Sequence, residues 1–228
     1  MRALLTIGAL LSLAGCASLP ENIDRPVSTA FEDADDTRLA LASRQTIDTH
    51  GHADSGESGF LLLGSGPDAF AAGAALARAA ERSIDAQYYL LHNDLTGKLF
   101  VDQLIRAADR GVRVRLLVDD MDLGGRTLGA AVLDHHPHIE VRLFNPFIRN
   151  SSRLTQLVTG FGSVTRRMHN KSYTVDNQVA ILGGRNIGDE YFGADPELDF
   201  TDVDVLLVGP IVTEVADSFD DYWNSELA

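Results

Sequence analysis

The sequence predicts an α/β fold in which helices cover a β-sheet. Two kinds of segment follow each other from residue 58 onward. In one kind every second side chain is apolar, as in a strand, and in the other the apolar side chains have helical spacing. That order is typical of a sheet covered by helices. The 228 residues are 45% hydrophobic, which is enough for one good-sized core or two small ones and too apolar for a mainly disordered chain.

Three helices and three strands are predicted between residues 66 and 144. Asp68 is the expected N-cap of the first helix, and Gly111 supplies the stop of the second. The helices are expected at residues 70–82, 96–110 and 127–134, and the strands at residues 84–90, 112–118 and 139–144.

The rest of the chain predicts more strands and a final helix. Residues 150–162 are expected to form a short helix or a loop over the site. Two strands, at 171–175 and 178–182, flank Asp176-Asn177, which predicts a hairpin turn. A further strand is expected at residues 203–208. The last helix carries an apolar stripe of Val212, Val215, Phe219 and Trp223, which predicts core packing.

The N-terminus carries an apolar run that ends at a cysteine. Met1 to Leu19 contain one charge and are shorter than a membrane span, which favours a secretory signal. Leu13-Ala14-Gly15-Cys16 resembles a bacterial lipobox, which implies a lipoprotein signal peptide over residues 1–16 and lipidation of Cys16; a plain signal peptide with a chance cysteine is the alternative. The protein is then expected in the cell envelope, lipid-anchored on the periplasmic side, and Ala17 favours the outer membrane by the same resemblance. Residues 17–57 are predicted to form a flexible tether.

Charge and cysteine content restrict the function. There are 33 acidic residues against 19 basic ones, a net charge of −14. Such a chain is a poor general nucleic-acid binder, because phosphate affinity needs clustered Lys and Arg. Cys16, the single cysteine, excludes an internal disulfide and a cysteine-cluster metal site.

Polar residues that suit a phosphate ester gather after residue 168. His169 and Lys171 are two apart in an extended segment, so their side chains share a face. The second strand of the hairpin ends in Gly183-Gly184, whose backbone can be approached closely and whose N–H groups can meet an oxyanion. Asn186 adds a neutral donor. We therefore predict a pocket for a phosphate ester with His169 as nucleophile.

This segment resembles the HKD motif of the phospholipase D superfamily, His-x-Lys, four residues, Asp, six residues, Gly-Gly/Ser-x-Asn, and every spaced position matches. Flanking segments are similar to the bacterial cardiolipin-synthase-like branch, namely residues 85–89, 106–115, 141–146 and 186–192. The resemblance covers about Gly59 to Trp223. It implies a phospholipase D-like domain over residues 58–228, with a mixed sheet flanked by helices, that is one half of the usual two-domain arrangement.

The resemblance also implies metal-independent chemistry without a cofactor. His169 would form a phosphohistidine, and Lys171 and Asn186 would hold the non-bridging oxygens. Asp176 is expected to be structural, holding the turn or tying to a distant basic group. An acid should hold the far nitrogen of His169; Asp202 is the preferred residue, with Asp204 and Glu190 as rivals.

Residues outside the motif leave alternatives open. Arg166-Arg167 suits either a phosphate contact or a solvated pair. Asp119-Asp120 suggests a metal-binding pair, but a hydrogen-bonding role is preferred. Of Tyr88 and Tyr89, one is expected to line the cleft and the other to be core.

The main departure from the family is the presence of one His-x-Lys where members of this branch carry two. The chain thus resembles an N-terminal half, and three functions stay open. The first is a phosphatidyltransferase or phospholipase D acting on phospholipids with a second HKD half. The second is a single-motif nuclease active as a homodimer. The third is a catalytically incomplete lipoprotein fragment.

Overall fold

The computed structural model describes residues 25–52, 56–121, 133, 135–147 and 166–228. All elements named below belong to one compact unit, residues 27–146 and 167–228; the other unit, residues 1–26 and 147–166, has few described residues. The predicted signal peptide with Cys16 and the predicted segment 150–162 lie outside the described residues. Of the predicted helix at 127–134, only residue 133 is described.

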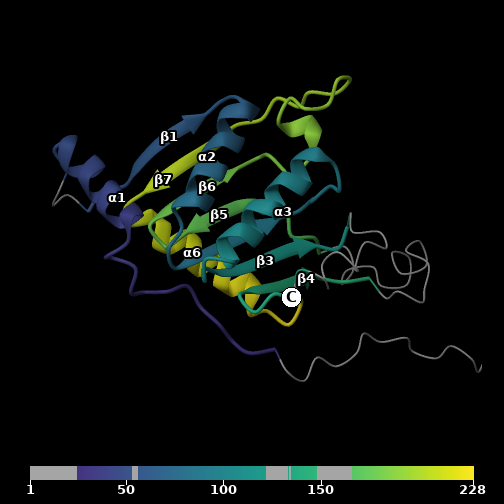
Figure 1. Ribbon diagram of the computed structural model, residues 1–228, viewed down its shortest axis with the longest axis horizontal. Helices are drawn as coiled ribbons and strands as arrows, with labels where there is room; N and C mark the ends of the chain where they lie inside the picture. Colours follow the sequence, from purple (N-terminus) through teal and green to yellow (C-terminus); the bar gives the residue numbers. More distant parts are fainter. Residues whose placement is uncertain (1–24, 53–55, 122–132, 134, 148–165) are drawn as a thin grey trace, which may run out of the picture. The chain divides into compact units, whose positions relative to one another are not determined.

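A seven-stranded mixed sheet forms the centre of the unit (Figure 1). The strand order is β1-β7-β6-β5-β2-β3-β4. β2, β3 and β4 run parallel to one another, whereas all other neighbours are antiparallel. The strands are β1 (Gly59–Leu63), β2 (Ser83–Tyr88), β3 (Arg113–Asp119), β4 (Ile139–Phe144), β5 (Ser172–Val175), β6 (Val179–Gly183) and β7 (Asp204–Val208).

Helices cover both faces of this sheet, which confirms the predicted fold class. α2 (Gly66–Ala79) and α3 (Leu95–Ala108) pack on one face, and α6 (Ile211–Trp223) packs on the other. Successive side chains of β3 point to opposite faces of the sheet. Leu116 belongs to the core under α2 and α3, and Leu117 belongs to the core under α6. In the part of the chain that the structure describes, no helix is long and apolar enough to cross a bilayer.

The first of these helices begins earlier than predicted. The hydroxyl of Ser65, rather than the side chain of Asp68, caps α2, and it accepts a hydrogen bond from the N–H of Asp68 at 3.1 Å. Pro67 lies in the first turn, where its missing N–H costs nothing.

The prediction of a flexible tether over residues 17–57 is wrong for most of its described part. Residues 38–49 form α1 (Arg38–Thr49), capped by the Thr37 side chain, and Leu39, Ala40 and Ser43 on this helix are buried. The N-terminal strap, residues 27–37, precedes α1 and is held against the domain.

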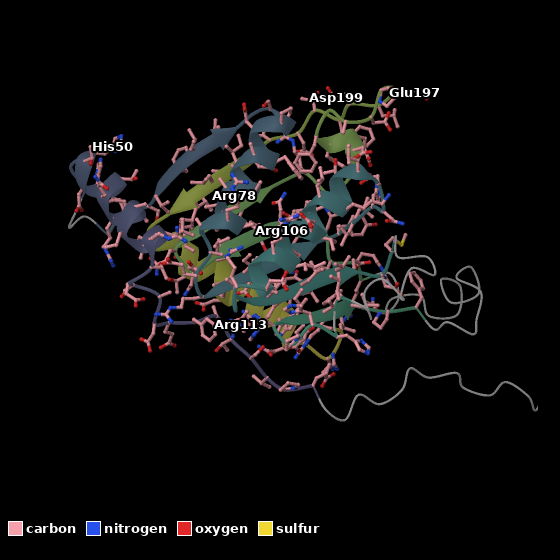
Figure 2. The ribbon with its side chains drawn as sticks, in the orientation of Figure 1. His50, Arg78, Arg106, Arg113, Glu197 and Asp199 are labelled. Carbon is pink, nitrogen blue, oxygen red and sulfur yellow. The ribbon has the colours of Figure 1, made fainter. Side chains whose placement is uncertain are left out.

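Side chains from distant parts of the sequence hold this strap against the domain. The carbonyl of Ser28 accepts a hydrogen bond from buried Arg115 at 2.8 Å, and the Ser28 hydroxyl accepts one from the Trp223 indole at 2.9 Å. Arg113, labelled in Figure 2, places its guanidinium 3.8 Å from the centroid of the Phe31 ring. The folded domain therefore begins near Ser28, about thirty residues before the predicted boundary at residue 58.

The predicted hairpin turn between β5 and β6 is confirmed. Asp176 and Asn177 have φ angles of 53° and 52°, the left-handed conformation of both central residues in a type I′ turn. The Asp176 carboxylate is fully buried and accepts hydrogen bonds from the backbone N–H groups of Glu81, Arg82 and Ser83 at 2.7–3.1 Å. Asp176 therefore fastens the hairpin to the beginning of β2, the structural role expected for it, through backbone groups rather than a basic side chain.

Replacing Asp176 with Asn tests this anchor. Asn also tolerates a positive φ, but it removes the negative charge that the backbone N–H groups stabilise and places an N–H against the N–H of Glu81, so we expect a loss of about 1–3 kcal/mol in the free energy of unfolding. Urea denaturation followed by circular dichroism measures the loss. The control is Asp217→Asn on the exposed side of α6. Equal stability of the two variants would contradict the anchoring role.

Candidate active site

The histidine and the lysine of the motif lie side by side just before β5. The ammonium Nζ of Lys171 is 3.2 Å from Nδ1 and 3.4 Å from Nε2 of the His169 imidazole, and it donates to the His169 carbonyl at 2.8 Å. His169 is exposed, whereas Lys171 is buried to 7% exposure. The structure thus presents an accessible imidazole with a cation fixed beside it, as the spacing predicted.

The aromatic ring of Tyr89 lies beside both side chains. The ring of Tyr89 lies 4.7 Å from the His169 imidazole, centroid to centroid, and 5.5 Å from Nζ of Lys171. Tyr88 instead points into the core against Phe100, and burial raises its pKa. Tyr88 is therefore the core tyrosine, although it also lines the pocket described next, and Tyr89 is the tyrosine beside His169.

A pocket between α2, α3 and the sheet extends to Lys171. Its apolar lining includes Phe70, Phe100, Ile181 and Phe192. Burial in these surroundings lowers the pKa of the Lys171 ammonium, and the negative charge of Asp202 partly opposes that shift.

Asn186 is fixed by its own hydrogen bonds. Its side-chain oxygen accepts from the N–H of Leu90 at 3.1 Å, and its amide donates to the hydroxyl of Tyr191 at 3.0 Å. The residue is buried to 4% exposure. Of the two N–H groups of the amide, one is therefore used within the protein.

The paired glycines serve a purpose other than the one predicted. The N–H of Gly183 donates to the Lys171 carbonyl at 3.3 Å, and that of Gly184 donates to the Val203 carbonyl at 3.2 Å. Both donors are thus engaged by the sheet, so the expected oxyanion contacts are wrong. A Cβ at Gly184 would instead lie 1.8 Å from an oxygen of Asp202, and one at Gly183 would lie 1.7 Å from an oxygen of Asp204. The glycines make room for two carboxylates.

Those carboxylates differ in their partners. Asp204 is buried and forms an ion pair with Arg185 at 3.2 Å, although burial still raises its pKa. Glu190 pairs with His92 at 3.2 Å. Both rivals for the acid partner of His169 are thus committed elsewhere. Asp202 is partly exposed and acts on Lys171, but among the described residues no carboxylate hydrogen bonds to His169.

Asp119 positions the segment that leads into the site. Its fully buried carboxylate accepts from the Met168 N–H and from the Arg167 guanidinium, both at 2.9 Å. Burial raises the pKa of this carboxyl although these donors lower it. The preferred hydrogen-bonding role is confirmed for Asp119, and Arg167 of the predicted arginine pair serves as its partner.

Solved structures of low sequence identity share this fold. NucT from Helicobacter pylori matches with a TM-score of 0.51 and 15% identity, covering 74% of this chain and 96% of that one. The phospholipase D family member Nuc from Salmonella typhimurium matches with a TM-score of 0.51 and 20% identity, covering 74% and 95%. These likenesses show the fold alone.

Sequence comparison identifies the family. The family model "Cardiolipin synthase, PLD-like domain" matches residues 74–223. Cardiolipin synthase C of Escherichia coli is 51% identical over 186 residues, which are 82% of this chain and 38% of that protein. Cardiolipin synthase A of Pseudomonas syringae is 30% identical over 163 residues, 71% of this chain and 32% of that protein. The chain thus spans about a third of the length of these relatives, and it belongs to the phospholipase D-like family of cardiolipin synthases.

Proposed function

We propose that this chain supplies one half of an active site that transfers phosphatidyl groups between alcohols, as in cardiolipin synthesis. The observation that carries the proposal is the exposed His169 imidazole with the Lys171 ammonium 3.2 Å away, at the spacing of the HKD motif. The names of the relatives supply the phospholipid context.

The first step is attack of the His169 imidazole on the phosphorus of a phospholipid. A nitrogen–phosphorus bond forms, and the bond from phosphorus to the headgroup oxygen breaks. Lys171 neutralises charge on the non-bridging oxygens, and Asn186 donates its second N–H to them. The departing headgroup oxygen takes a proton from a general acid.

The second step reverses the first with another alcohol. That alcohol gives its proton to the general base and attacks the phosphohistidine, and the nitrogen–phosphorus bond breaks. One imidazole cannot serve as both nucleophile and acid, and this sequence contains a single His-x-Lys. The second imidazole therefore comes from another HKD half or from a second copy of the chain.

Asp202 is proposed as the acid that maintains the charge state of this site. Its charge favours the ammonium of Lys171, which burial disfavours. We also propose that it holds the far nitrogen of His169 once substrate occupies the site, since its two rivals have other partners.

Phospholipid is favoured over nucleic acid by charge. A net charge of −14 opposes a polyphosphate backbone, whereas a single phosphodiester at a membrane needs only a local cation. The resemblance of residues 13–16 to a lipobox supports placement on the periplasmic side of a membrane, with the outer membrane favoured.

Substitution of His169 tests the nucleophile. We expect His169→Ala to reduce cardiolipin formation from phosphatidylglycerol vesicles by at least about a thousandfold and to abolish acid-labile phosphate on the protein, because no nitrogen remains to attack. His136→Gln, which changes another histidine on a loop, is the control. Retained turnover in His169→Ala would remove the nucleophile from the mechanism.

The other two functions have their own outcomes in the same assay. Cleavage of DNA by the wild-type chain without turnover of lipid would replace the proposal with a nuclease. Absence of any phosphohistidine on the wild-type chain, even with a second HKD half added, would replace it with an incomplete fragment.

The pH dependence of the site follows from Lys171 and Asp202. Asp202→Asn removes a negative charge that favours the ammonium, so the already lowered pKa of Lys171 should fall further and the basic limit of activity should move to lower pH. The chain contains two lysines, Lys98 and Lys171, so ¹³C-lysine NMR gives two titrations, with Lys98 as internal reference.

Asp199→Asn is the charge-matched control for that titration. Asp199 lies near the tip of the loop between η1 (Asp189–Tyr191) and β7, as Figure 2 shows. It should leave the Lys171 titration unchanged. An unchanged or higher pKa of Lys171 in Asp202→Asn would disprove the coupling.

Lipidation of Cys16 is tested in a bacterial host. Wild-type protein should incorporate radiolabelled palmitate and sediment with membranes, whereas Cys16→Ala should do neither, because the thiol that takes the diacylglycerol is gone. Ser18→Ala is the control. Palmitate in the Cys16→Ala protein would contradict the lipobox.

A further inference from the structure

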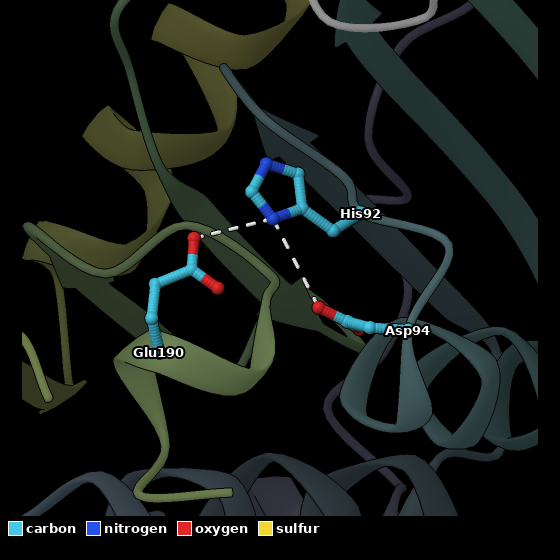
Figure 3. A group of neighbouring side chains, drawn as sticks. All are labelled: His92, Asp94 and Glu190. Carbon is cyan, nitrogen blue, oxygen red and sulfur yellow. Dashed lines mark ion pairs between the residues drawn. The ribbon is translucent and has the colours of Figure 1, made fainter. Parts of the chain in front are cut away.

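A second group of ligand-type side chains lies outside the residues given a catalytic role. The His92 cluster consists of His92, Asp94 and Glu190, and Figure 3 shows the imidazole facing both carboxylates. Nδ1 of His92 is 3.2 Å from a Glu190 oxygen and 3.9 Å from an Asp94 oxygen. All three ligand atoms lie within 4.8 Å of one another, and the side chains are 13–27% exposed.

The backbone holds these side chains in place. Asp94 is the N-cap of α3, where it accepts from the Gly97 N–H at 2.8 Å. The N–H of His92 donates to the Ile187 carbonyl at 2.8 Å. A Cβ at Gly188 would lie 2.7 Å from Nδ1 of His92 and 2.8 Å from a Glu190 oxygen. Glycine therefore leaves the space in which imidazole and carboxylate meet.

The charge of the cluster favours a cation. With His92 neutral, its two carboxylates give a charge of −2. Among the described residues, neither Asp94 nor Glu190 forms an ion pair with a lysine or arginine, and His92 is their shared partner. Two carboxylates beside one imidazole make a site whose charge a divalent ion would neutralise.

The spacing also suits a metal ion. Zinc binds histidine nitrogen and carboxylate oxygen at about 2.0–2.2 Å, so tetrahedral ligand atoms lie roughly 3.4 Å apart. The separations of 3.2 Å and 3.9 Å from His92 bracket that value, and the Asp94 and Glu190 oxygens lie within 4.8 Å of each other. Three protein ligands leave at least one coordination position for water.

We infer that the His92 cluster binds one zinc-type divalent cation that fastens the loop after Asn186 to the loop between β2 and α3. Leu91 and Ile187 already form a bridge between these loops. Because its ligands come from both loops, the ion would stabilise the position of one loop against the other. The inference is independent of the proposed function.

Calorimetric titration of the full chain with Zn²⁺ at pH 7.5, repeated with Co²⁺ followed by visible absorption, tests the site. Wild-type protein should bind one ion tightly, with a cobalt spectrum of at most five-coordinate type. His92→Gln and Glu190→Gln should each weaken that site at least tenfold, because each removes a direct ligand.

His136→Gln is the matched control. His136 is similarly exposed and pairs with a single carboxylate, Asp109, at 3.3 Å, so it lacks the second carboxylate. This variant should keep the tight site. The inference is overturned if wild-type protein binds no tight ion, if Glu190→Gln binds as tightly as wild type, or if His136→Gln alone removes the site. Unchanged circular dichroism of the Gln variants without metal shows that lost binding is not lost folding.

Discussion

A buried carboxylate holds each end of the strand that carries the active site. Before β5, the backbone N–H of Met168 donates to Asp119. Directly after β5, Asp176 accepts hydrogen bonds from the backbone at the beginning of β2. Such groups cost several kcal/mol when buried alone, and here backbone N–H groups satisfy them. The position of His169 and Lys171 depends on these two fixed points, because β5 has only four residues.

The space needed by two carboxylates explains the double glycine. Side chains at residues 183 and 184 would occupy the places of the Asp204 and Asp202 carboxylates. Asp204 is used to neutralise buried Arg185, and Asp202 acts on Lys171. The space left by Gly184 thus admits the carboxylate whose charge favours the ammonium of Lys171.

Much of the fold was predictable because its signals are local. Alternation placed β2, β3 and β4 to within two residues, and Asp176-Asn177 marked the hairpin. β1 was missed because Gly59–Leu63 is a continuous apolar run without alternation. α1 was missed although Thr37 gives a cap and Leu39, Ala40 and Ile47 have the spacing of one helix face.

The parts of the site that lie within the motif were predictable from the sequence. The contacts between residues that are distant in the sequence were not. His169 and Lys171 lie together as their spacing predicted. The use of glycine N–H groups by the sheet depends on pairing with residues 171 and 203, which no local pattern encodes. His92 and Glu190 are likewise brought together only by the fold.

The hydrogen bonds of Ser28 to Arg115 and Trp223 limit the distance between the folded domain and residue 16. Twelve steps separate residue 16 from residue 28, and a fully extended chain covers at most about 40 Å in that distance. A domain held at residue 16 would thus work close against its anchoring surface, with little freedom to reach a second membrane.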